Sequence, residues 1–197
     1  MTGLPPDPAE LEARLPAVLA GEPDAIDAWY RWEHPRVHRL CFGFLADPAE
    51  ADDLAQDAML HLLDHLPRWD RRRPYAAWRN AVVLNRCRDR LRRLAARRRA
   101  EDGAAAERLP ARLPAPDAEA QRSEVRAILA EALGALSPRE REAFVLRDLE
   151  GCATDAVAEA MGVAPSSVRS LLTLARRRLR GLLGERLPEA DAEGALP

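Results

Sequence analysis

Hydrophobic residues recur along this chain with the spacing of helices. One stripe lies in the first quarter of the chain and comprises Ile26, Trp29, Tyr30, Val37, Leu40, Cys41 and Phe44. The next comprises Ala51, Leu54, Ala55, Ala58, Leu62 and Leu66. Alternating β-branched and aromatic residues, the pattern typical of strands, are missing from the sequence. The sequence therefore predicts an all-α fold.

Prolines and charged residues interrupt the helical pattern between Asp102 and Gln121. Proline cannot continue a helix, and this stretch offers no large apolar cluster for a core. It is predicted to be a flexible linker between two small helical domains. The expected parts are an N-terminal extension (1–22), a first domain (23–100), the linker (101–122), a second domain (123–184) and a tail (185–197).

The second domain has the pattern of a helix-turn-helix. Ser137 to Glu140 forms a capping box with proline at the first helical position, so a helix is expected to begin there and to end at Gly151. A short helix is expected from Thr154 to Gly162, and Pro165 can begin the next one. Two helices joined by a tight glycine turn suit the major groove of DNA.

The last helix of this domain is predicted to present polar and basic side chains outward. Its buried side would hold Val168, Leu171 or Leu172, Ala175, Leu179 and Leu182. Its outward side would hold Ser166, Ser167, Arg169, Ser170, Thr173, Arg176 and Arg177. The N–H groups of a helix start bind phosphate and arginine reads base edges, so DNA binding is favoured over a plain three-helix bundle with a solvated basic face.

The first domain pairs an acidic helix with a basic one. Asp47 to Glu50 is a helix start by the same capping logic. The outer side of that helix is acidic around an exposed leucine, and comprises Asp52, Asp53, Gln56, Asp57, Leu60 and Asp64. This mixture favours docking on a basic surface of a protein partner, with a merely solvated acidic face as the alternative.

The helix from Tyr75 onward carries arginine along its outer side, with Leu84, Cys87, Leu91 and Leu94 predicted inside. The arginines predicted to lie largely outside are Arg79, Arg86, Arg88, Arg90, Arg92, Arg93 and Arg97 to Arg99. Such a density of charge favours an anionic partner such as a phosphate backbone. The preceding segment could stack on unpaired bases, unless its tryptophans belong to the core; it contains Trp69, Arg71, Arg72, Arg73, Tyr75 and Trp78.

The net charge of −2 therefore hides a segregation of sign along the chain. All 30 basic residues are arginine, whose planar guanidinium binds phosphates and base edges in a bidentate way. Cys41, Cys87 and Cys152 lie far apart without a C-x-x-C pair, which argues against a disulfide framework or a cysteine metal site. No apolar run is long enough to span a membrane and the N-terminus lacks a signal peptide, so a cytoplasmic protein is expected.

In this order the motifs resemble the extracytoplasmic-function sigma factors of the sigma-70 family, from about Pro23 to Gly184. Asp52 to Asp57 resembles region 2.2, Tyr75 to Arg93 resembles regions 2.3 and 2.4, and Leu136 to Arg180 resembles region 4. The resemblance implies a non-enzymatic factor that binds core RNA polymerase and promoter DNA, without a cofactor or metal, and that is itself bound by an anti-sigma factor.

The resemblance also assigns roles to residues. It implies that Asp53, Gln56 and Asp57 help to dock on the clamp helices of the largest polymerase subunit. It implies that Asn85, the loop from Trp69 to Pro74 and the following arginines, including Arg88, Arg92 and Arg93, engage the melted −10 element. Arg169, Ser170, Thr173 and Arg176 would face the −35 element. The sequence departs from the family pattern at Ala164, Leu171 and Leu174, where serine and basic or polar residues are usual.

Three alternatives stay open at this point. A stand-alone helix-turn-helix regulator would leave the acidic helix and the aromatic loop unexplained. A metal enzyme is suggested only by the i, i+4 pairs His34/His38 and His61/His65, which match no full metal motif. A sigma-like regulator that sequesters an anti-sigma factor would keep the fold and change the role.

Overall fold

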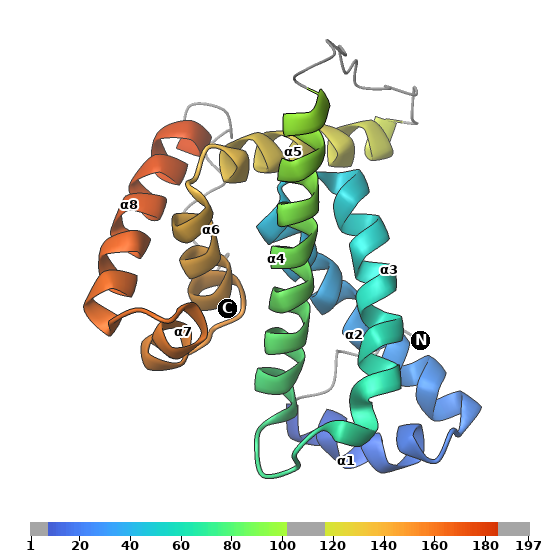
Figure 1. Ribbon diagram of the computed structural model, residues 1–197. Helices are drawn as coiled ribbons and strands as arrows, with labels where there is room; N and C mark the ends of the chain where they lie inside the picture. The colour runs from blue at the N-terminus through green and yellow to red at the C-terminus, as the bar shows by residue number, and fades with distance from the viewer. Residues whose placement is uncertain (1–7, 102–116, 185–197) are drawn as a thin grey trace, which may run out of the picture. The chain divides into compact units, whose positions relative to one another are not determined.

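A computed structural model describes residues 8–101 and 117–184, and within these two ranges it contains helices and no strand (Figure 1). The prediction of an all-α fold is therefore confirmed. The helices form two compact units, the first built from α1 to α4 and the second from α5 to α8. No helix in the described ranges is both long and apolar enough to cross a membrane.

The first unit is a small helical bundle. Its helices are α1 (Pro8–Leu19), α2 (Pro23–Leu45), α3 (Pro48–His65) and α4 (Tyr75–Glu101), with a short 3-10 turn (η1, Leu66–Arg68) after α3. α1 packs on α2 and α4, and α2 packs on α4. The core of the unit contains Trp29, Val37, Leu40, Cys41, Phe44, Leu54, Met59, Leu62, Leu66, Tyr75, Val83, Leu84 and Cys87.

The helix α1 belongs to this bundle, although the sequence interpretation placed residues 1–22 in an extension. Leu11, Leu15 and Val18 are all buried, and their spacing is that of one helix face. The stripe is short and Pro16 interrupts the segment, which is why the pattern gave a weak signal. The N-terminal segment therefore contributes to the core of the first unit.

The helices on both sides of the predicted linker extend into it. α4 continues to Glu101, and α5 (Asp117–Gly134) begins before the predicted end of the linker at residue 122. The three prolines that predicted a helix break, Pro110, Pro114 and Pro116, all precede Asp117, so none of them opposes this start. The rest of the predicted linker, residues 102–116, and the tail lie outside the described residues.

The second unit follows the predicted helix-turn-helix pattern. Its remaining elements are α6 (Pro138–Phe144), a π-helical segment (η2, Val145–Leu149), α7 (Thr154–Met161) and α8 (Pro165–Gly184). The predicted capping box is present: the Ser137 hydroxyl accepts from the Glu140 backbone N–H, and the Glu140 carboxylate accepts from the Ser137 backbone N–H. Gly151 and Gly162 adopt the left-handed conformation expected of residues that end a helix.

The turn between α2 and α3 holds an alanine, Ala46, in the left-handed conformation with φ of 53°. The Cβ atom of alanine makes this conformation strained, whereas glycine adopts it without a steric penalty. Ala46→Gly is therefore expected to raise the free energy of unfolding by about 1 kcal/mol, measured by urea denaturation. The matched control is Ala49→Gly in the first turn of α3, which should lower it by roughly 0.5–1 kcal/mol; equal effects of the two changes would contradict the assignment.

Candidate nucleic-acid and protein interfaces

The acidic side of α3 is exposed as a group. The buried stripe of this helix, Ala51, Leu54, Ala55, Ala58, Met59 and Leu62, turns the intervening residues to solvent. The exposed residues include every predicted docking residue, namely Asp52, Asp53, Gln56, Asp57 and Leu60. Leu60 is 64 % exposed, the largest value among the exposed large hydrophobic residues. We call these five residues the α3 acidic face.

Polar side-chain contacts hold α3 against its two neighbouring helices. His38 of α2 contacts the Asp52 carboxylate at 2.7 Å. Arg90 of α4 donates to Glu50 at 2.5 Å and lies 3.8 Å from the Asp53 carboxylate. These contacts set the direction in which the α3 acidic face points, because they tie α3 to both α2 and α4.

The segment between α3 and α4 is a compact loop closed by its own hydrogen bonds. The indole N–H of Trp69 donates to the Arg73 carbonyl at 3.0 Å, and the Arg73 backbone N–H donates to the Asp70 carbonyl at 2.9 Å. Arg72 forms an ion pair with Asp70, and this hydrogen bond lowers the pKa of the Asp70 carboxyl group. Arg71, Arg72 and Arg73 are exposed while Trp69 is half-buried. The loop therefore presents three guanidinium groups beside an indole ring.

Tyr75 occupies a different place from the one expected of a base-stacking residue. The residue is 1 % exposed, and its hydroxyl accepts from the Trp29 indole N–H at 3.0 Å. Burial, followed by the nearby Glu33 carboxylate, raises the pKa of the phenol. The ring of Trp69 meets it edge-on at 5.6 Å between centroids, and the Trp78 ring lies 5.7 Å away. Tyr75 thus supports the two half-buried tryptophans from inside and cannot itself stack on a base.

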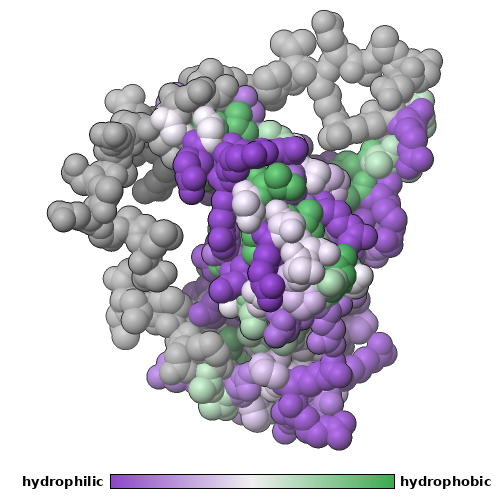
Figure 2. All heavy atoms as spheres, turned by 90° about the vertical axis from the view of Figure 1, so that its left-hand side faces the viewer, coloured by the Kyte–Doolittle hydropathy of each residue, from purple (hydrophilic) through white to green (hydrophobic). Residues whose placement is uncertain are grey.

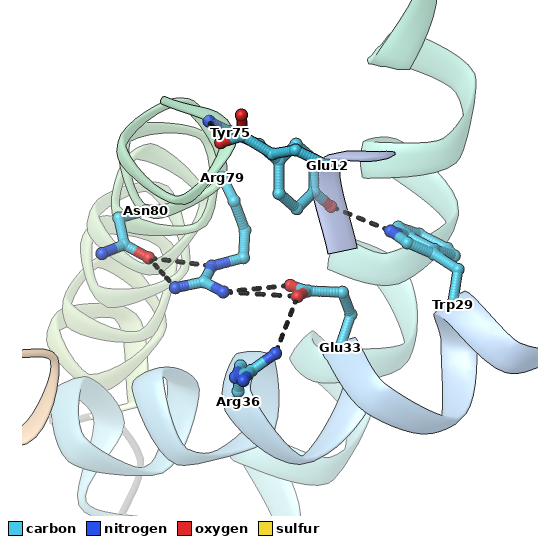
Figure 3. Close-up of polar contacts among 7 residues, drawn as sticks. All are labelled: Glu12, Trp29, Glu33, Arg36, Tyr75, Arg79 and Asn80. Atoms are coloured by element: carbon cyan, nitrogen blue, oxygen red, sulfur yellow. Dashed lines mark hydrogen bonds and ion pairs between the residues drawn. The ribbon is translucent and has the colours of Figure 1, made fainter. Parts of the chain in front are cut away.

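A buried polar network lies next to Tyr75 (Figure 3). Arg79 of α4 forms an ion pair with Glu33 of α2 at 3.1 Å and donates to the Asn80 side chain at 2.8 and 2.9 Å. Arg36 also contacts Glu33, at 3.4 Å. The sequence predicts that Arg79 lies largely outside with the other arginines, and this is wrong because the residue is only 5 % exposed. It is a structural residue that joins α4 to α2.

The remaining arginines of α4 follow the prediction more closely. Asn85, Arg92 and Arg93 are exposed, and Arg88 is half-buried. Arg92 forms an ion pair with Asp89, the acidic residue that interrupts the series. Leu84 and Cys87 are buried on the opposite side of the helix. From Asn85 onward α4 therefore presents amide and guanidinium groups outward, beyond the aromatic loop.

The second unit presents α8 as the exposed helix of its helix-turn-helix. Val168, Leu172, Ala175 and Leu179 are buried, which resolves the choice between Leu171 and Leu172 in favour of Leu172. All the residues predicted to face outward are exposed: Ser166, Ser167, Arg169, Ser170, Thr173, Arg176 and Arg177. Figure 2 views the side on which α8 lies in Figure 1, where hydrophilic side chains surround single hydrophobic ones. Leu174 is one exposed hydrophobic residue of this helix, and Leu171 is half-buried.

Several outward groups of α8 are already engaged within the unit. The Ser170 and Thr173 hydroxyls donate to the carbonyls of Ser166 and Arg169, at 3.2 and 2.9 Å. Arg176 forms a two-point ion pair with Asp148 at 2.6 and 2.8 Å, which raises the pKa of its guanidinium. Binding of an anion by Arg176 would therefore compete with Asp148.

The cap of α6 also orients α8. Glu140, whose carboxylate completes the capping box with Ser137, accepts from Arg178 of α8 at 2.8 Å. Glu140 is buried, so one acidic side chain satisfies a helix start and holds a second helix. At the start of α8 itself, Ala164 offers no side-chain cap, and its carbonyl accepts from the Ser167 and Val168 backbone N–H groups. The start of α8 thus depends on Pro165 and backbone bonds.

Histidine and cysteine side chains of the first unit meet in pairs. No group of three or more His, Cys, Asp or Glu side chains in the described ranges could hold a metal ion. The rings of His61 and His65 stack at 3.8 Å between centroids, and burial, with Arg86 next in importance, lowers the pKa of His61. The contact with Cys41 and burial raise the pKa of Cys87 well above its ordinary value, which makes it an unreactive core thiol.

Family comparisons match both units of the chain. Sigma-70 region 2 matches residues 29–106, and Sigma-70, region 4 matches residues 126–179. The ECF RNA polymerase sigma factor SigM of Mycobacterium tuberculosis is 34 % identical over 170 residues, covering 86 % of this chain and 83 % of that protein. The RNA polymerase sigma-E factor of Streptomyces coelicolor is 30 % identical over 174 residues, covering 87 % of this chain and 93 % of that protein.

Solved structures share the fold. The sigma factor RpoE of Bartonella quintana, solved with the anti-sigma factor NepR, aligns with a TM-score of 0.62 and 22 % identity, covering 80 % of this chain and 96 % of that one. CnrH, solved with the cytosolic domain of CnrY, aligns with a TM-score of 0.62 and 23 % identity, covering 91 % of this chain and 99 % of that one.

Proposed function

The chain belongs to the extracytoplasmic-function sigma factors of the sigma-70 family. On this basis we propose which of its surfaces binds the polymerase, which the −10 element and which the −35 element. A sigma factor binds core RNA polymerase and directs it to promoters, while the chemistry of RNA synthesis belongs to the core enzyme. The protein is accordingly proposed to act in the cytoplasm, where polymerase and DNA are found, as a non-enzymatic initiation factor.

The α3 acidic face is the proposed docking surface for the polymerase. One observation carries this assignment: Leu60 is 64 % exposed beside the aspartates of the α3 acidic face, opposite the buried stripe of the same helix. A face of one charge sign steers association with a surface of the opposite sign, and an exposed leucine among the charges can supply the apolar centre of the interface. The proposed docking residues are Asp52, Asp53, Gln56, Asp57 and Leu60.

The loop between η1 and α4 and the following arginines are proposed to hold the melted −10 strand. Half-buried indoles can stack on bases, and exposed guanidinium groups can bind the phosphates between them. The proposed contacts are Trp69, Arg71, Arg72, Arg73, Trp78, Asn85, Arg88, Arg92 and Arg93. Tyr75 acts behind this surface and is not among the contacts.

The helix α8 is proposed to enter the major groove at the −35 element. Its outward row offers arginine for base edges and hydroxyls for phosphates. The proposed contacts are Ser166, Ser167, Arg169, Ser170, Thr173, Arg176 and Arg177. The exposed Leu174 beside them would contribute an apolar contact to DNA or to an anti-sigma factor, the class of partner with which the RpoE structure was solved.

The pair Asp53→Arg and Gln56→Ala is expected to weaken binding to core polymerase by about 2 kcal/mol, or about thirtyfold, because a like charge then faces a basic partner surface. The measurement is capture of purified core RNA polymerase by the tagged chain. Wild-type protein should capture it stoichiometrically.

The matched control reverses an exposed aspartate of α2 outside the α3 acidic face, Asp24→Arg, and should capture polymerase like wild type. Equal loss in both variants would point to net charge instead of docking. Absence of capture by the wild type, with duplex DNA still bound, would favour a stand-alone helix-turn-helix regulator.

A further inference from the structure

The N-terminus of α4 is capped by a side chain from another helix. Pro74 precedes Tyr75, and its carbonyl accepts from the Trp78 backbone N–H, so it stands at the capping position. Proline has no side-chain acceptor for the free N–H groups of the first turn. The Tyr75 backbone N–H instead donates to the Glu12 carboxylate of α1 at 2.6 Å. A residue 63 positions earlier in the chain therefore provides the cap.

Tyr75 is held at two points. Glu12 fixes its backbone, and the Trp29 indole N–H fixes its hydroxyl at 3.0 Å (Figure 3). Its ring in turn meets the rings of Trp69 and Trp78. This one residue thus contacts both half-buried indoles and supports them from inside the unit.

The loop before α4 is linked to Tyr75 through Trp69. Trp69 is bonded through its indole N–H to the Arg73 carbonyl, and Arg73 is bonded through its backbone N–H to Asp70. A displacement of Tyr75 would move Trp69 and, through these bonds, the turn that presents Arg71 and Arg72. The Glu12 contact therefore acts on the whole segment proposed to hold the melted strand.

Glu12 can perform this role because α1 is itself anchored. Leu11, Leu15 and Val18 are buried on one side of the helix, and the Arg14 guanidinium lies 4.7 Å above the centre of the Trp32 ring. Glu12 is itself half-buried and follows the buried Leu11 in the chain. The match to Sigma-70 region 2 begins at residue 29, so α1 and Glu12 lie outside the matched segment.

We propose that Glu12 of α1 is a positioning residue for the capture of the melted promoter strand, since it caps α4 at Tyr75 and so fixes the loop of Trp69 to Pro74. The inference rests on the proposed function of that loop. A loop ordered before binding loses less entropy when the strand arrives, so its affinity is higher than that of a mobile loop. The helix α1 is then part of the strand-binding apparatus as well as of the core.

The test uses holoenzyme reconstituted with core polymerase and measures its binding of a labelled single-stranded oligonucleotide, which carries the non-template −10 sequence of a promoter that this holoenzyme opens. Glu12→Ala should weaken binding about fivefold to tenfold, the value of a lost helix cap. Glu12→Gln keeps an acceptor oxygen and should stay within about twofold of wild type. A loss with Gln equal to that with Ala would overturn the hydrogen-bond role.

A stability control separates positioning from folding. Val37→Ala removes buried methyl groups from α2 and destabilises the same unit without touching the Glu12 contact. It should bind the strand as wild type does at temperatures where both are folded. The proposal is overturned by unchanged binding in Glu12→Ala, or by an equal loss in Val37→Ala.

A second measurement reads the loop directly, without polymerase or DNA. Trypsin cleaves after Arg71 and Arg72, and a released loop is cut faster than an ordered one. Glu12→Ala should accelerate cleavage at these two sites about fivefold relative to sites in α8; no acceleration would overturn the proposal. Failure of wild-type holoenzyme to bind the strand would count against the proposed function of the loop, while the trypsin result would still decide whether Glu12 orders it.

Discussion

Glu33→Ala should lower the free energy of unfolding of the first unit by about 3–5 kcal/mol, because it leaves the Arg79 guanidinium buried without its carboxylate. Glu33 is 0 % exposed and Arg79 is 5 % exposed, so water cannot replace the lost partner. Arg36 loses a contact as well. This cost would be a large share of the stability of a small domain.

Tryptophan fluorescence during urea denaturation measures this loss specifically. All four tryptophans, Trp29, Trp32, Trp69 and Trp78, belong to the first unit, so the signal reports on that unit alone. The matched control is Asp27→Ala, which breaks the exposed pair with Arg31 on the same helix and should cost roughly 0–1 kcal/mol. Equal midpoints for the Glu33 and Asp27 variants would contradict burial of the Glu33 pair.

Simultaneous replacement of Arg88, Arg92 and Arg93 by glutamine should reduce promoter binding by holoenzyme about a hundredfold or more. Each charge-assisted contact to phosphate contributes about 1.5–3 kcal/mol when made. The slope of log affinity against log salt concentration should also fall by about two, since about 0.7 counterions are released per contact to single-stranded DNA. The measurement is open-complex formation on the cognate promoter across a salt series.

Lysine at the same three positions is the informative control. It keeps the charge and loses the bidentate geometry, so the salt slope should stay near that of wild type while affinity falls less than with glutamine. Retention of the full open-complex yield by the glutamine variant would remove this part of α4 from the DNA interface. Circular dichroism should remain helical in both variants, because the outward side of α4 is not part of the core.

Much of the fold could be predicted because helix signals are local. The capping box at Ser137, the left-handed glycines at 151 and 162 and the proline at 165 each mark an element boundary from a few adjacent residues. The exposure of α8 and of the α3 acidic face followed from the stripes opposite them. These features depend on spacing alone, which the sequence displays directly.

The buried polar network could not be predicted in the same way, because it depends on which helices face one another. Glu33 lies within the stripe of Trp29 and Val37, and Arg79 lies within that of Tyr75 and Val83. A charged residue at helical spacing inside an apolar stripe is the signal that would have indicated burial. Because Glu33 and Arg79 carry opposite charges, they would further have indicated that α2 and α4 pack together.

The cap that Glu12 of α1 provides to α4 is even harder to predict from the sequence than the buried polar network. A glutamate that caps a helix 63 positions later has no local pattern, and α1 itself has a short stripe broken by Pro16. Tyr75 is buried by its contacts with Glu12 and Trp29, so an aromatic residue that the sequence placed among the base contacts belongs to the core. A tryptophan that stacks on bases is more exposed than one in the core, and the sequence pattern does not show how exposed each tryptophan is.

The long separation of the contacts around Tyr75 has a consequence for synthesis on the ribosome. Glu12 and Trp29 leave the exit tunnel first, yet their partner follows 63 and 46 residues later. At elongation rates of about 5–20 residues per second, some seconds pass between the synthesis of Glu12 and that of Tyr75. The polar pairs between helices of the second unit span 28 and 38 residues, so the nascent chain can close those sooner. In the first unit α1 can therefore pack on α2 early, while the two bonds to Tyr75 form only after the start of α4 has emerged.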